Sequence, residues 1–163
     1  MPHRRDIRRL AMQVLYQIDL RGEADIPLIA EGLADGLDRP QVREEALKLA
    51  LAAWQDHARA DALSGELAPG WPTHRQPPVD RSILRLAHWE MVSGHAPVKV
   101  VINEAVELAK DFCAQQSPSF INGVLDKMAR RLESQGNIPK GEAPEAAAPE
   151  AWLKDAKEGE QPA

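Results

Sequence analysis

Apolar residues recur at helical spacing along most of the chain. The first stripe follows the i, i+3, i+4, i+7 spacing of one helix face and predicts a helix that ends near Arg21-Gly22. Its members are Ile7, Leu10, Ala11, Val14, Leu15 and Ile18. In projection, Arg5 and Arg9 fall opposite this stripe and Arg8 lies on its flank, so we expect these arginines to stay solvated when the helix packs.

The same spacing predicts further helices, which brings the total to about seven. They are a short helix over 27–37, a longer helix after Asp38-Arg39-Pro40, one helical turn in the Gly- and Pro-rich connection 64–79, and helices over 80–93, 97–112 and 117–133. We expect 97–112 to be the hidden central helix. Ser117-Pro118 should supply the N-cap of the last helix and the proline that follows it.

One polar residue interrupts the inward stripe of the helix over 80–93. This stripe contains Ile83, Leu86, Ala87 and Glu90. A buried carboxylate needs hydrogen-bond partners, because burying an unpaired charge is very unfavourable. We expect Glu90 to be structural and to accept hydrogen bonds from backbone N–H groups at the start of a neighbouring helix.

The composition agrees with an all-α fold. Of 163 residues, 44% are hydrophobic but only 4% are aromatic, which favours helices packed on helices. We expect one helical domain over 1–133, followed by a disordered acidic tail over 134–163 that is rich in Gly, Pro, Ala and Glu. No apolar stretch approaches the roughly 20 residues of a membrane span and no signal core is visible, so a cytoplasmic protein is expected.

Charge is distributed unevenly along the chain. The overall net charge is −5, but residues 1–21 contain five arginines and two aspartates, a local charge of +3. Residues 134–163 contain three lysines and six acidic residues, a local charge of −3. A basic start and an acidic end suggest that the N-terminal helix faces RNA.

Enzymatic chemistry has no support in the sequence. There is no Gly-rich phosphate loop, no paired-cysteine motif and no nucleophile with a nearby base. The five histidines lack the spacing of metal ligands, and the single cysteine, Cys113, is expected to be structural. We therefore expect no catalytic residue, no metal site and no cofactor.

Exposed cations and a flat side chain together suit single-stranded RNA. Arg4, Arg5, Arg8 and Arg9 supply the cations, and Phe120 lies beside Lys127 on the outer edge of the last helix. An arginine-rich helix alone is equally typical of a solubilising face. A helical protein-protein adaptor without an RNA role therefore remains the alternative.

Three segments resemble the NusB family in order and spacing. They are DRSILRLA with WEM and PVKVVINEAVELAK over 80–110, SPSFINGVLDK over 117–127, and the N-terminal RR, R and AMQVLY between residues 4 and 16. The resemblance spans Arg4 to Leu132 and is weakest in the middle of the chain. A NusB-like domain also begins certain ribosomal RNA cytosine methyltransferases, but those continue into a long catalytic domain where we expect only the tail.

The resemblance implies a fold of two perpendicular three-helix bundles and a non-enzymatic role. Family members are antitermination factors that bind boxA RNA of ribosomal RNA transcripts together with the ribosomal protein NusE. They then join other Nus factors on RNA polymerase. Some members also self-associate, so the sequence leaves monomer and homodimer open.

The resemblance also implies which residues bind. The expected RNA-binding residues form two clusters that should converge on one surface, namely Arg4, Arg5, Arg8, Gln116, Ser119 and Phe120. The expected partner-binding residues are Asp80, Arg81 and Leu84. Asp6, Arg9 and Gln116 depart from the residues common in the family, which could shift RNA preference without removing the role.

Overall fold

The computed structural model describes residues 4–139, and these residues are helical almost throughout. The elements are α1 (Arg4–Arg21), α2 (Ile26–Ala34), α3 (Pro40–Leu67), α4 (Pro78–Ser93), α5 (Val98–Phe112) and α6 (Ser117–Ser134), with 3₁₀ turns at Glu23–Asp25 and Thr73–Arg75. Residues 4–139 contain no strand. The predicted all-α fold is confirmed, and six helices plus the turn at Thr73–Arg75 account for the expected count of about seven.

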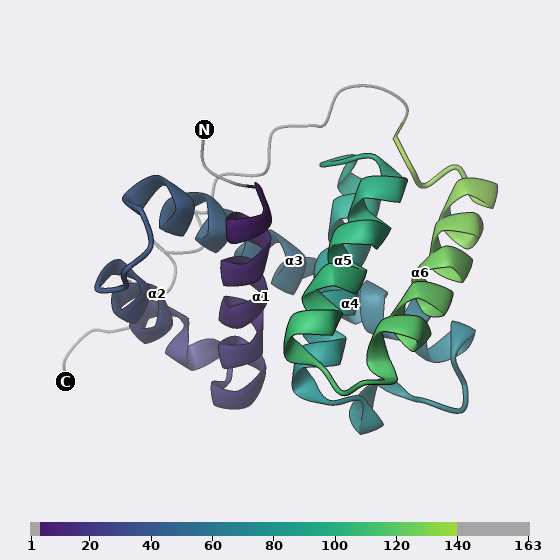
Figure 1. The fold of residues 1–163 in the computed structure, drawn as a ribbon, viewed down its shortest axis with the longest axis horizontal. Coiled ribbons are helices and arrows are strands. Elements are labelled where there is room, and N and C mark those ends of the chain that lie inside the picture. Colours follow the sequence, from purple (N-terminus) through teal and green to yellow (C-terminus); the bar gives the residue numbers. More distant parts are fainter. Residues whose placement is uncertain (1–3, 140–163) are drawn as a thin grey trace.

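The helices form two groups of three (Figure 1). Helices α1, α2 and α3 pack together, as do α4, α5 and α6, and both α1 and α3 lie against α4. The two groups therefore share one core, as expected for two joined three-helix bundles. In the view of Figure 1, α1, α5 and α6 lie in front, with α3 and α4 behind them.

The predicted apolar stripes of the first and last helices are buried. All six stripe residues of α1 belong to the core, and so does the stripe of α6, which comprises Ile121, Val124, Leu125, Met128, Ala129 and Leu132. Apolar periodicity thus located both helices correctly. The sequence also predicted correctly that the helix now called α4 ends at Gly94, which adopts the left-handed conformation with φ 67°.

Several helix boundaries differ from the prediction. Helix α2 ends at Ala34 rather than near residue 37, and α4 begins at Pro78, because proline suits the first turn of a helix. Gln116, not Ser117, is the N-cap residue of α6, and it makes no side-chain capping bond. Ser117 is instead buried in the first turn.

The predicted tail begins inside the described structure. Ser134 is the last residue of α6, Ile138 packs against the core, and the Pro139 ring lies beside Gly94. Residues 134–139 therefore belong to the folded part of the chain. The rest of the predicted tail, 140–163, lies outside the described residues.

Helix α4, not α5, is the central helix, so the prediction that 97–112 is hidden was wrong. Helix α4 is buried on nearly every side, including five polar or charged residues: Asp80, Ser82, Arg85, His88 and Glu90. In contrast, α5 leaves Val100 and Phe112 exposed. The buried polar residues of α4 made it look amphipathic in sequence. Ion pairs and hydrogen bonds allow Ser82, Arg85, His88 and Glu90 to be covered, whereas one carboxylate oxygen of Asp80 has no hydrogen-bond partner among residues 4–139.

No helix within residues 4–139 is both long enough and apolar enough to cross a membrane.

Candidate nucleic-acid interface

The start of α1 presents two exposed arginines. Arg4 is exposed, and Arg5 is 60% exposed while its guanidinium donates to both carboxylate oxygens of Glu104 on α5, each at 3.0 Å. The hydrogen bonds from Arg5 hold the pKa of Glu104 below its usual range. The same bonds raise the pKa of Arg5, so both groups stay charged and the start of α1 is fixed to α5.

Arg8 is buried, which contradicts the expectation that it stays solvated. Its Nε lies 3.0 and 3.1 Å from the two carboxylate oxygens of Glu90, and the side chains are only 6% and 1% exposed. Glu90 is therefore inward and structural as predicted, but its partner is Arg8 rather than a helix start. Because Glu90 neutralises the Arg8 charge inside the protein, Arg8 can support RNA binding only by positioning α1.

The start of α6 places the second cluster around an aromatic pair. Phe120 is exposed and meets Trp71 edge to face, with ring centroids 4.1 Å apart at 73°. Gln116, Ser119 and Phe120 line one side of a cavity of about 640 Å³, and Trp71 and Lys127 line it as well. The structure thus brings together all three residues predicted at this helix start.

A groove between α5 and α6 adjoins this cluster. It has a volume of about 500 Å³, and its polar lining residues are Lys99, Asn103, Lys110, Ser119 and Asn122. Of these, only Ser119 was predicted from the sequence. For the three residues on α5 the signal was present, because Lys99, Asn103 and Lys110 recur at i, i+4 and i+11 on its outer face.

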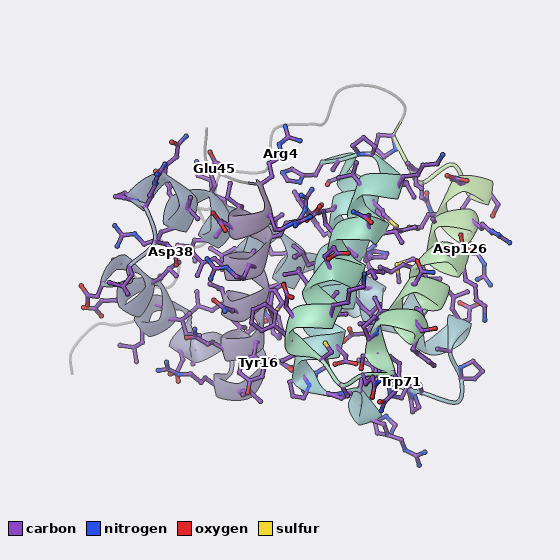
Figure 2. All side chains as sticks on the ribbon, viewed as in Figure 1. Arg4, Tyr16, Asp38, Glu45, Trp71 and Asp126 are labelled. Atoms are coloured by element: carbon purple, nitrogen blue, oxygen red, sulfur yellow. The ribbon has the colours of Figure 1, made fainter. Side chains whose placement is uncertain are left out.

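The two predicted clusters do not converge on one compact patch. Figure 2 shows Arg4 at the upper edge of the molecule and Trp71, the neighbour of Phe120, at its lower edge. The starts of α1 and α6 lie at opposite ends because the two helices run in opposite directions (Figure 1). The α5–α6 groove lies between them, so the candidate surface is long rather than round. We use the name RNA face for this candidate surface, which consists of the groove together with Arg4, Arg5, Gln116, Ser119 and Phe120.

The predicted partner-binding residues are not on the surface. Asp80 and Leu84 are 1% and 2% exposed, and Arg81 is largely covered because its guanidinium pairs with Asp19. In this conformation Asp80 and Leu84 are too deeply buried to contact a partner, so the prediction of direct contact is wrong for these two residues. Their burial follows from the central position of α4, which the sequence did not reveal.

Asp80 also raises the pKa of Cys113, the only cysteine of the chain. The pKa of Cys113 is raised to about 12, mainly by burial of the thiol, and further by a hydrogen bond to Asp80 and by the negative charge of Asp80. All three effects disfavour the thiolate, which is the reactive form. At pH 8 we expect Cys113 of the folded protein to react with an aromatic disulfide reagent roughly a hundredfold more slowly than glutathione, because its lower thiolate fraction outweighs the greater nucleophilicity of a more basic thiolate. Equal rates would contradict this environment, and denaturant should restore ordinary reactivity.

The structure offers no metal centre among residues 4–139. No three His, Cys, Asp or Glu side chains in that range are grouped so as to hold a metal ion. The buried histidine, His88, instead lies with its Nδ1 2.5 Å from Asp56.

Comparison with known proteins identifies the family. The model for the NusB family matches residues 5–130. The transcription antitermination protein NusB of Saccharopolyspora erythraea is 40% identical over 131 residues, which cover 79% of this chain and 88% of that protein. The protein of the same description from Rubrobacter xylanophilus is 40% identical over 123 residues, covering 75% and 86%.

Solved structures agree. NusB from T. maritima matches with a TM-score of 0.71 at 30% identity, covering 80% of this chain and 92% of that one. A crystal structure of antitermination factors NusB and NusE in complex with dsRNA matches with a TM-score of 0.69 at 27% identity, covering 80% and 98%. These relatives are regulatory proteins rather than enzymes. In both sequence and fold, this chain belongs to the NusB family.

Proposed function

We propose that this chain is a cytoplasmic transcription antitermination factor that binds boxA RNA of ribosomal RNA transcripts together with the ribosomal protein NusE. It links that RNA to the elongating RNA polymerase in company with other Nus factors. Family membership supports this role, as does the similarity to a NusB–NusE complex with dsRNA. The observation that carries the proposal is the RNA face, which combines exposed cations with an aromatic pair.

The shape of the RNA face suits an extended single strand. Cations at intervals can follow a phosphate backbone, while aromatic rings can stack on bases that are not paired. Arg4 and Arg5 lie at one end, Lys99 and Lys110 along the groove, and Phe120 at the other end. An elongated RNA would engage all three parts, whereas a compact ligand could reach only one.

The partner would dock near the buried residues rather than on them. Asp80 lies under Cys113, whose neighbour Phe112 is exposed, and Arg81 holds Asp19, whose neighbour Leu20 is exposed. We propose that NusE contacts Phe112 and Leu20, and that the buried residues only position them. Exposed apolar side chains of this kind are typical of interface cores.

The experiment is binding of a labelled boxA-like single-stranded RNA to the purified protein, with and without NusE, at two salt concentrations. Arg4→Ala should reduce the slope of log affinity against log salt by about 0.7, the value for one lost phosphate contact. Phe120→Ala should weaken binding by about 5- to 100-fold, the usual loss for one stacked base. Arg130→Ala is the control, because this exposed residue pairs with Asp126 of its own helix and with no other residue of 4–139.

The outcome also separates the alternative function. If NusE fails to tighten RNA binding and neither Arg4→Ala nor Phe120→Ala has an effect, the chain is a protein-protein adaptor. Self-association is tested in the same samples by light scattering. A homodimer that uses the RNA face would dissociate when RNA is added.

A further inference from the structure

The outer stripe of α6 contains a gap between an aromatic ring and a cation. Phe120, Gly123 and Lys127 follow one another at i, i+3 and i+7, so they lie on one face of the helix. A Cβ placed on Gly123 would meet no atom within 4 Å. The missing side chain therefore leaves an open floor in the cavity of about 640 Å³ that all three residues line.

Trp71 also lines this cavity, where its ring contacts that of Phe120, and the loop that carries it is held firmly. Its backbone N–H donates to the carbonyl of Ala68 at 2.9 Å, and its carbonyl accepts from the Gln76 amide at 3.1 Å. Gln76 is itself buried and donates to Ser64 at 3.2 Å. The Trp71 ring is thus presented by an anchored loop, so little conformational entropy would be lost when a ligand meets it.

The lining of the cavity defines the class of ligand. Its floor is apolar, formed by residues such as Leu67, Pro77 and Val124, and amide and hydroxyl groups of Gln116 and Ser119 lie at the rim. Lys127 is the only charged lining residue, and it forms no ion pair with another residue of 4–139. A flat ring with polar edges that is attached to an anion matches this combination.

We propose that Trp71 and Phe120 form a pocket for one unpaired base of the bound RNA, with Lys127 contacting the phosphate beside it. This inference rests on the proposed function and adds Trp71, Gly123 and Lys127 to it. Stacking tolerates any base, whereas Gln116 and Ser119 can read hydrogen-bonding groups on the base edge. The pocket therefore holds one position of the RNA in a fixed register.

An apolar side chain of a protein partner is a poorer occupant. It would bury the Trp71 and Phe120 rings, but it would leave the unpaired cation of Lys127 without an anion and the Gln116 amide without a partner. The pocket also adjoins the α5–α6 groove through Ser119, which lines both. A strand lying in the groove would therefore reach the pocket.

The test uses the full chain with NusE and a series of boxA-like RNAs, each with one abasic residue at a different position. For the wild type, one abasic position should weaken binding by about 5- to 100-fold. Trp71→Ala should weaken binding of intact RNA to a similar degree but lose nothing more with that abasic RNA. Trp71→Phe keeps a ring and should retain most of the affinity.

Gly123→Leu supplies an independent variant that fills the pocket. It should weaken binding like Trp71→Ala without lowering the thermal midpoint, because leucine favours a helix interior more than glycine does and the space is open. Arg130→Ala again serves as the control, since it lies on α6 outside the cavity. The thermal midpoint of every variant shows whether it is folded.

The proposal is overturned if Trp71→Ala changes no affinity, or if it weakens every RNA of the series by the same factor. It is also overturned if Trp71→Ala and Gly123→Leu weaken NusE binding alone, which would assign the cavity to a protein. In these cases the effects of NusE and Arg4→Ala on RNA binding would leave the proposed function standing. If the wild type binds no RNA with NusE present, both proposals fail.

Discussion

Replacing Arg8 by alanine is expected to lower the free energy of unfolding by about 3–5 kcal/mol, because it leaves the buried Glu90 carboxylate with only the half-exposed His95 ring, 3.9 Å away, as an ion-pair partner among residues 4–139. Apolar side chains of α4 and α5 surround the pair, namely Ile83, Leu86, Val101 and Leu108. Water cannot readily solvate the stranded charge there. Urea unfolding followed by circular dichroism measures the loss.

A double variant separates the cost of a stranded charge from the value of the pair. Arg8→Met combined with Glu90→Leu should recover most of the lost stability, since apolar replacement of a whole buried pair is often neutral. Arg5→Ala is the matched control, because its pair with Glu104 is on the surface, where solvent screens the two charges and the pair contributes little to stability. An Arg8→Ala variant as stable as Arg5→Ala would show that the buried pair does not form.

Arg85→Ala is expected to destabilise the protein by a similar amount, about 3–5 kcal/mol. The Arg85 guanidinium donates to both carboxylate oxygens of Asp61 at 2.8 and 2.7 Å and to Asp19 at 3.1 Å. Burial lowers the pKa of Arg85, but the hydrogen bonds to Asp61 and Asp19 raise it by more, so the residue stays charged. It thereby joins α4 to both α3 and α1.

Arg85→Lys tests whether the fork of the guanidinium matters. A lysine keeps the charge, but its single ammonium group cannot reproduce three hydrogen bonds to two carboxylates in this geometry, nor the guanidinium's position over the Trp54 ring. We expect it to recover less than half of the stability lost in Arg85→Ala. Arg59→Ala, at an exposed position on α3, should be nearly neutral. Full recovery by lysine would mean that charge alone is sufficient.

The sequence predicted what depends on local periodicity. The buried stripes of α1 and α6 follow directly from apolar spacing, and Gly94 ended α4 where expected. The order of burial among helices was not accessible in the same way. Helix α4 carries charges on faces that other helices cover. Partners on those helices neutralise these charges, such as Asp19 and Asp61 for Arg85 and Arg8 for Glu90, and only the three-dimensional structure reveals them.

For the binding surface, sequence identified residues but not their arrangement. Glu90 was recognised as an inward carboxylate, yet its partner Arg8 is 82 residues away and appeared only as a flank residue of its own helix. Trp71 was not predicted as a binding residue, because the sequence Gly70-Trp71-Pro72 indicated only a turn in the connection. Periodicity also carries no information about helix direction, so the separation of Arg4 from Phe120 could not be predicted.

The same long separation has a consequence during synthesis. Helix α1 leaves the ribosome first, but the carboxylate that neutralises Arg8 is made 82 residues later. At about 5–20 residues per second, this interval lasts roughly 4–16 s. Until then α1 can pack only against α2 and α3, with Arg8 still hydrated. The final docking of the N-terminal helix is therefore a late event, and a nascent chain stalled before residue 90 should display α1 incompletely covered.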